Sequence, residues 1–122
     1  MAFLCSEFKQ ADQRRRPHDL AEAHRRLIEE TVAAVFAVPV GKIRAPSRGS
    51  ASVAFARQVA MYLAHIVLGH SYTAIGHSFG RDRTTVAHAC ALVEDVRDNP
   101  PADCLLSALE CVLEPLARQA RA

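Results

Sequence analysis

Apolar residues recur every three to four positions in several segments of the chain, and proline or glycine separates the segments. This periodicity indicates amphipathic helices. The first predicted helix runs from about Asp19, which can act as its N-cap, to Val38, because the ring of Pro39 cannot continue it. Its predicted apolar face consists of Leu20, Ala23, Leu27, Thr31, Ala34, Val35 and Val38.

A polar loop and a second long helix are predicted next. The segment VGKIRAPSRGS should form a short turn and a loop, since Pro46 and Gly49 interrupt it. The second helix is predicted over about 52–68, and Gly69 suits its C-terminal cap. Its wide apolar face consists of Val53, Ala56, Val59, Ala60, Leu63, Ile66 and Val67.

Two further helices should meet at a tight turn. The segment 71–79 predicts a helix of about two turns, Gly80 breaks the chain, and Asp82 can cap a third helix that ends near Arg97. A short helix, a glycine turn and a helix with a polar start are typical of a helix-turn-helix, here over about 71–97. The residues expected to point inward are Ile75, Phe79, Val86, Cys90, Val93 and Val96.

A last helix is predicted over about 102–119, because Pro100 and Pro101 end the preceding pattern. One face should carry Leu105, Leu109, Val112 and Leu116, with Leu106 and Leu113 flanking it. We expect this stripe to pack onto the other helices. The alternative is a seam between two copies, which would make the protein a homodimer through its C-terminal helix.

These elements predict an all-α fold, a compact helical bundle with an embedded helix-turn-helix and an additional C-terminal helix. A chain of 122 residues suffices for one core. We expect a flexible basic arm over 1–17 and a single domain over 18–122. No stretch approaches about 18 uninterrupted apolar residues and no secretory signal is recognisable, so we expect a cytoplasmic protein without a membrane span.

The cysteines indicate no special chemistry. Cys5, Cys90, Cys104 and Cys111 form no C-x-x-C pair, so we expect reduced and mostly buried thiols. The spacings of cysteine and histidine match no common zinc pattern, and we expect neither a metal nor a cofactor. No arrangement of residues points to a reactive site, so we expect no enzymatic activity and no small-molecule substrate.

Positive charge is concentrated in the middle of the chain. From Lys42 to Arg97 there are seven cations and three anions, whereas the tail after Arg97 carries two more anions than cations. Polyanions are the natural partners of a basic surface, although an excess of four charges does not establish one.

The start of the third predicted helix is rich in groups that can read DNA, namely Arg81, Asp82, Arg83, Thr84 and Thr85. In a helix-turn-helix this end of the second helix meets base edges in the major groove. Arginine suits guanine O6 and N7, and threonine suits an acceptor or the thymine methyl. Asp82 can accept from a cytosine amino group or simply cap the helix. His88, two residues past the inward Val86, should be exposed and can contact DNA or water.

The motifs ARQVAMYLA, AIGHSFG and RDRTTVAHA resemble the C-terminal DNA-binding domain, domain IV, of the bacterial chromosomal replication initiator DnaA. The resemblance covers roughly 27–97. It implies a Trp-repressor-like helical domain that reads double-stranded DNA through the helix-turn-helix. It also implies an arginine from the basic loop in the adjacent minor groove.

The resemblance assigns base reading to Asp82, Arg83, Thr84 and Thr85, with Arg83 standing where the family has histidine. The turn before them has one glycine where the family usually has two. The basic-loop arginine falls nearest Arg48, and the family's Leu-Pro falls on Tyr72 and Thr73. We expect contacts to the DNA backbone or the minor groove from Lys42, Arg44, Arg48, Arg57, Ser71, Tyr72, Thr73 and Arg81.

The sequence contains no G-x-x-x-x-G-K-[ST] phosphate loop, and 122 residues are too few for an ATPase module as well. We therefore expect a stand-alone, sequence-specific DNA-binding protein that acts as a bacterial transcription regulator. The alternative is a protein-interaction module that binds the replication initiator or another regulator and binds DNA only weakly.

Overall fold

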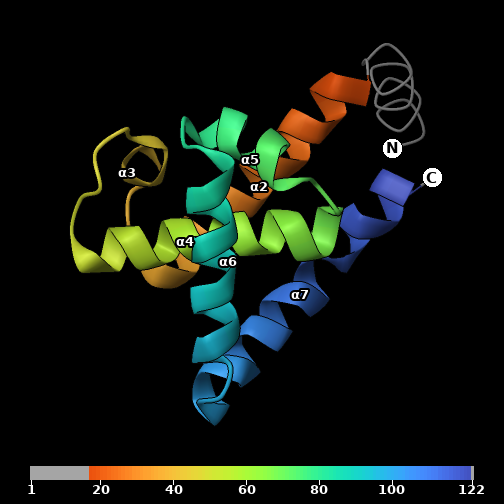
Figure 1. The fold of residues 1–122 in the computed structure, drawn as a ribbon. Helices are drawn as coiled ribbons and strands as arrows, with labels where there is room; N and C mark the ends of the chain where they lie inside the picture. The colour runs from red at the N-terminus through yellow and green to blue at the C-terminus, as the bar shows by residue number, and fades with distance from the viewer. Residues whose placement is uncertain (1–16, 122) are drawn as a thin grey trace.

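The computed structural model describes residues 17–121, which form helices joined by short connections and contain no strand (Figure 1). The predicted all-α fold is confirmed. The arm predicted over 1–17 lies outside the described residues, except for Pro17, the first residue of the first described helix. The helices are α2 (Pro17–Phe36), α3 (Val40–Arg44), α4 (Ala51–Leu68), α5 (Tyr72–Phe79), α6 (Arg83–Val96) and α7 (Pro100–Arg121).

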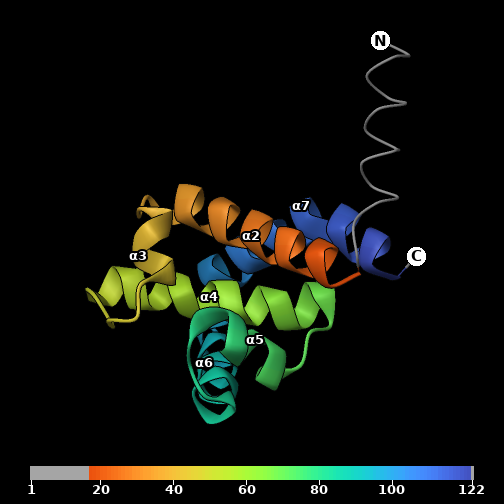
Figure 2. The ribbon, with the colours of Figure 1, turned by 90° about the horizontal axis from the view of Figure 1, so that it is seen from above.

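Helix α4 lies at the centre and contacts every other described helix. Figure 2 shows α2 and α7 on one side of it and α5 and α6 on the other. By length and composition α4 could cross a membrane, but 61% of it is buried inside the fold, which is the environment of a core helix. The side chain of Ser50 caps its start, and Gly69 ends it in the left-handed conformation, as the sequence predicts for Gly69.

The predicted inner face of the first helix is only partly correct, because Val38 packs against the core but Leu27, Ala34 and Val35 are exposed. Leu27 and Val35 are 50% and 46% exposed, and Asp19 lies in the first turn instead of capping the helix. The true inner face mixes apolar and polar residues, so apolar spacing alone could not find it. Glu29, for example, is buried and accepts a hydrogen bond from Nε of Arg44 at 2.7 Å. The residues that α2 buries are His24, Arg25, Ile28, Glu29, Val32 and Ala33.

The chain between α2 and α4 also differs from the prediction. Helix α2 ends at Phe36, and the short helix α3 replaces the predicted turn. Ile43 of α3 is fully buried and belongs to the core cluster. Five residues are too few for helical periodicity to be recognised in a sequence.

Helix α7 begins two residues earlier than predicted, and only part of the predicted stripe faces the core, since Leu109 and Leu116 pack inward. Pro100 and Pro101 start it instead of preceding it, because the first turn of a helix needs no backbone N–H from proline. Leu105 is 40% and Val112 is 67% exposed. The buried face consists of Leu106, Leu109, Leu113 and Ala117.

Arg97, at the end of α6, fastens α7 to the rest of the molecule. Its Nη1 donates to the hydroxyl of Tyr62 on α4 at 2.9 Å and to the carboxylate of Glu110. Its Nε donates to Oδ1 of Asp103 at 2.6 Å, and its Nη2 to the hydroxyl of Ser107 at 2.8 Å. These hydrogen bonds, first of all the one to Asp103, raise the pKa of Arg97 above its usual value.

The prediction that the cysteines are mostly buried holds only for Cys90 among those described. Cys104 and Cys111 are exposed on α7, and Cys5 lies outside the described residues. Burial, with a contribution from Glu94, raises the pKa of the Cys90 thiol to about 11. Cys90 is therefore a poor nucleophile, and thiol reagents should react first with the exposed pair.

Candidate nucleic-acid interface

Helices α5 and α6 form the predicted helix-turn-helix. The hydroxyl of Ser71 caps α5 by accepting from the backbone N–H of Ala74 at 3.1 Å, and Gly80 ends it with a φ of +65°. The turn is closed tightly, because the N–H of Arg81 donates to the carbonyl of Gly76 at 2.9 Å. A Cβ at Gly76 would overlap the carbonyl oxygen of Arg81, so this position requires glycine.

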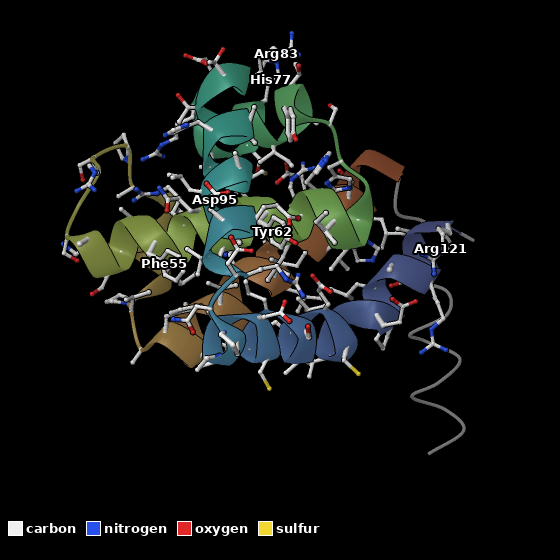
Figure 3. All side chains as sticks on the ribbon, turned by 60° about the horizontal axis from the view of Figure 1, so that its bottom comes forward. Phe55, Tyr62, His77, Arg83, Asp95 and Arg121 are labelled. Atoms are coloured by element: carbon white, nitrogen blue, oxygen red, sulfur yellow. The ribbon has the colours of Figure 1, made fainter. Side chains whose placement is uncertain are left out.

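The first turn of α6 leaves its polar side chains facing outward. Asp82 caps the helix, since its Oδ1 accepts from the backbone N–H groups of Thr84 at 2.9 Å and Thr85 at 3.3 Å. Arg83, Thr84, Thr85 and His88 are all exposed. Figure 3 places Arg83 at the end of the molecule where α5 and α6 meet.

Arg57, which the sequence suggests as a phosphate contact, is buried under the basic loop (residues 45–49). It is only 4% exposed. Its guanidinium donates to four backbone carbonyls, those of Ile43 (2.8 Å), Arg48 (2.9 Å), Lys42 (2.8 Å) and Ser47 (3.1 Å). This geometry contradicts a phosphate contact and shows that Arg57 instead holds the loop against α4.

Arg81 ties the same loop to the helix-turn-helix. Its Nη1 donates to the carbonyl of Phe79 at 2.7 Å, and its Nη2 points to the carbonyls of Ala45 (3.1 Å), Pro46 and Ser47 (both 3.3 Å). Two arginines, from α4 and from the turn, therefore fix the loop that carries Arg48.

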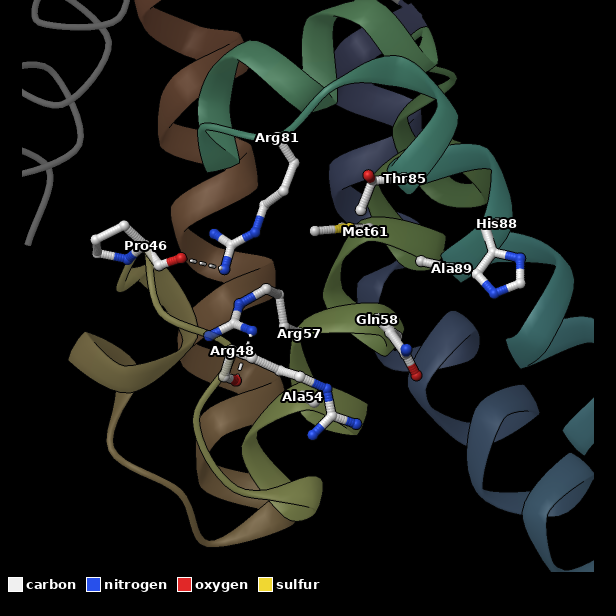
Figure 4. A pocket seen from close by; sticks show the side chains of 10 residues that line it. All are labelled: Pro46, Arg48, Ala54, Arg57, Gln58, Met61, Arg81, Thr85, His88 and Ala89. Carbon is white, nitrogen blue, oxygen red and sulfur yellow. Dashed lines mark hydrogen bonds between the residues drawn. The ribbon is translucent and has the colours of Figure 1, made fainter.

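An open hollow lies between the basic loop and the outer side of α6 (Figure 4). It brings together Arg48 and Arg81 with Thr85 and His88 of α6, and Arg57 forms part of its floor. Burial, followed by the neighbouring charges of Arg81 and Arg48, lowers the pKa of Arg57. Three guanidinium groups thus share one hollow, which favours an anion there.

A second hollow lies on the other side of the turn. Thr73, Asp82 and Arg83 line it, together with His77, which the sequence-based prediction did not assign to the interface. His77 is exposed, and Figure 3 shows His77 and Arg83 at the same end of the molecule. The sequence offered one signal that His77 is exposed, namely its position two residues before the inward-pointing Phe79.

The remaining predicted contacts lie apart from these hollows or have partners within the chain. Arg44 is paired with Glu29, and its Nη2 lies 3.7 Å from Glu30. Lys42 is exposed on α3, and the half-buried Tyr72 packs against the ring of His65 with centroids 4.5 Å apart and an angle of 35° between the ring planes.

The comparisons with known proteins agree with this geometry. A family described as the bacterial dnaA protein helix-turn-helix matches residues 26–93. Chromosomal replication initiator protein DnaA 1 of Protochlamydia amoebophila is 43% identical over 67 residues, which is 55% of this chain and 15% of that relative. Chromosomal replication initiator protein DnaA 2 of Chlamydia trachomatis is also 43% identical over 67 residues, 14% of its length. The aligned part is a small fraction of either relative.

Proposed function

The chain belongs to the bacterial dnaA protein helix-turn-helix family, and from this premise we propose that it is a sequence-specific, double-stranded DNA-binding protein of the bacterial cytoplasm. We propose further that it regulates transcription. The sequence contains no phosphate loop, so these residues provide a DNA-binding element without a nucleotide-binding site of that type.

The exposed first turn of α6 is the proposed base-reading element. Arg83, Thr84 and Thr85 are exposed and can reach base edges in the major groove, with His88 one turn further along. Asp82 has a second oxygen for a cytosine amino group, but Oδ1 already caps α6. Its main contribution is therefore to shape this turn.

The hollow beside α6 is the proposed phosphate site, and it is the observation that carries the proposal. Arg48 and Arg81 lie there beside the exposed side of α6, with Arg57 beneath them. Like charges held this close repel one another, and a DNA phosphate would offset the repulsion. Because hydrogen bonds to backbone carbonyls hold the loop before binding, the backbone at Arg48 needs little further ordering when its side chain meets the DNA.

Selection of bound duplexes from a random library tests this function. We expect a recurrent motif and an affinity that falls steeply with salt concentration. Arg48→Ala should weaken binding to all sequences and lower the salt slope by about one, whereas Arg26→Ala, which removes an exposed arginine from α2, should change neither. A flat sequence profile together with capture of the replication initiator or another regulator would favour the interaction module instead.

A further inference from the structure

Helix α7 carries an apolar flank that no described residue covers. Leu105 and Val112 are 40% and 67% exposed. At about 100° per residue they share one side of the helix with other small or apolar exposed residues, so the flank spans about three turns. Its members are Cys104, Leu105, Ala108, Cys111, Val112 and Pro115.

The charges of α7 lie on a different flank. Asp103 and Glu110 face Arg97, and Glu114 pairs with Arg121 at 3.1 Å. Between the two prolines that start the helix and Arg118, the apolar flank therefore contains no charged side chain. Exposed large apolar residues elsewhere, such as Leu27 and Ile66, sit on other helices. This segregation is typical of a helix that packs on two sides.

The charges at the two ends of the flank point to a second copy of the chain. Asp98 and Arg118 are exposed, and neither forms an ion pair with another described residue. Arg118 lies ten residues, roughly 15 Å along α7, after Ala108. Asp98 lies ten residues before Ala108, in the turn two residues ahead of the start of α7. If two α7 helices cross antiparallel at Ala108, each Arg118 meets the partner's Asp98. A parallel pairing would place like charges together.

The face that bears the apolar flank is remote from the DNA-reading end. Cys104 and Cys111 of α7 are exposed, and in Figure 3 helix α7 lies at the opposite end of the molecule from Arg83. Figures 1 and 2 agree, because α7 and the start of α6 lie at opposite sides of α4 in both views. In a dimer with a two-fold axis through this flank, the first turns of the two α6 helices therefore point away from each other.

We propose that the protein forms an antiparallel homodimer through the apolar flank of α7, and that the dimer bridges two DNA segments. The bridging half rests on the proposed function, whereas the dimer half does not. Because Ala108 is small, the two helices can approach closely at the crossing. Two recognition ends on opposite sides cannot reach adjacent half-sites on one straight duplex.

The oligomeric state is tested by sedimentation equilibrium of the full chain under reducing conditions. We expect twice the 13.3 kDa chain mass. Val112→Glu should yield a folded monomer, because the side chain is exposed within one chain. The matched control is Val35→Glu, which alters a valine exposed on α2 and should remain dimeric. A monomeric wild type, or equal effects of both substitutions, would overturn the proposal.

The orientation is tested by charge exchange and by thiol crosslinking. Asp98→Arg or Arg118→Glu alone should raise the dissociation constant of the dimer about two- to thirtyfold, because a two-fold dimer contains the exposed ion pair twice. The double variant should restore the wild-type dissociation constant. In a Cys5→Ser background, a short bismaleimide should join Cys104 to the partner's Cys111. Cys104→Ser and Cys111→Ser should each abolish the crosslink, whereas a parallel dimer would keep one in each variant.

Bridging is tested by recovering a labelled duplex on beads that carry a second duplex, using the selected sequence. The wild type should recover it, and Val112→Glu should bind the bead duplex with unchanged affinity but recover no label. A dimer that binds DNA without recovering label overturns bridging. A dimer that binds no DNA overturns the proposed function and leaves the antiparallel dimer standing.

Discussion

At the scale of single residues, two positions illustrate how the fold gives a side chain its role. Arg57 is a cation in a basic region, which in the sequence resembles a phosphate contact. In the structure four backbone carbonyls surround it, and it is buried. Gly76 is an ordinary helical residue in the sequence, but the closeness of Arg81 makes its missing side chain necessary.

Arg57→Lys should reduce DNA affinity nearly as much as Arg57→Met. One ammonium group cannot reach four carbonyls spread over the loop, so the loop that carries Arg48 should loosen in both variants. The measurement is duplex binding by fluorescence anisotropy over a range of salt concentrations. Full recovery of affinity in Arg57→Lys would show that the charge alone matters, and the structural role would be wrong.

Gly76→Ala should destabilise the protein by about 1–3 kcal/mol, because the new methyl group overlaps backbone that cannot move aside easily. Urea denaturation measures this change. The control is Gly41→Ala in α3, where nothing lies within 4 Å of the added Cβ and the change should be small. Similar stabilities of the two variants would mean that the turn is not closed as described.

At the scale of elements, the sequence predicted where most helices start and stop but not which sides of α2 and α7 face inward. The signals at the ends are local. Gly69 and Gly80 adopt the left-handed conformation, and Asp82 caps α6. The inner sides depend on partners far along the chain, such as Gln119, which lies 2.9 Å from the buried His24. The spacing of apolar residues in the sequence gives no information about such long-range polar pairs.

Removal of the Arg97 side chain should weaken the attachment of α7 to α4 and α6, while Leu106, Leu109 and Leu113 keep it packed in the core. Arg97→Met should destabilise the protein by about 2–4 kcal/mol, because it leaves Asp103 and Glu110 without their cation in a partly buried site. Arg121→Met, which breaks an exposed pair with Glu114, should cost under about 1 kcal/mol. Denaturation curves compare the two, and equal losses would contradict the role given to Arg97.

At the scale of the whole molecule, a partly buried polar contact between Arg25 and His70 should make stability depend on pH. Nη1 of Arg25 lies 2.9 Å from Nδ1 of His70, so the ring must be neutral to accept the hydrogen bond. Burial, followed by the charges of Arg25 and His24, lowers the pKa of His70, and Glu22 opposes this effect. The contact joins α2 to the connection before α5.

Stability should therefore fall as the pH drops below about 6.5. Below this pH the unfolded chain takes up a proton on His70, whereas the folded chain does so only at lower pH. The free energy of unfolding should therefore fall by up to about 1.4 kcal/mol for each pH unit. In His70→Gln the amide oxygen can still accept from Arg25 but does not titrate. Its free energy of unfolding should decline less between pH 7 and 5, and identical slopes in both proteins would refute the linkage.

The central claim is that the first turn of α6 reads bases, and the most direct test is the affinity of wild type and Arg83→Ala for the selected duplex and its single-base variants. We predict that Arg83→Ala loses roughly 1–3 kcal/mol on the selected sequence and no longer distinguishes the bases at one position. Equal affinity of the wild type for all duplexes, unchanged by Arg83→Ala, would contradict the claim.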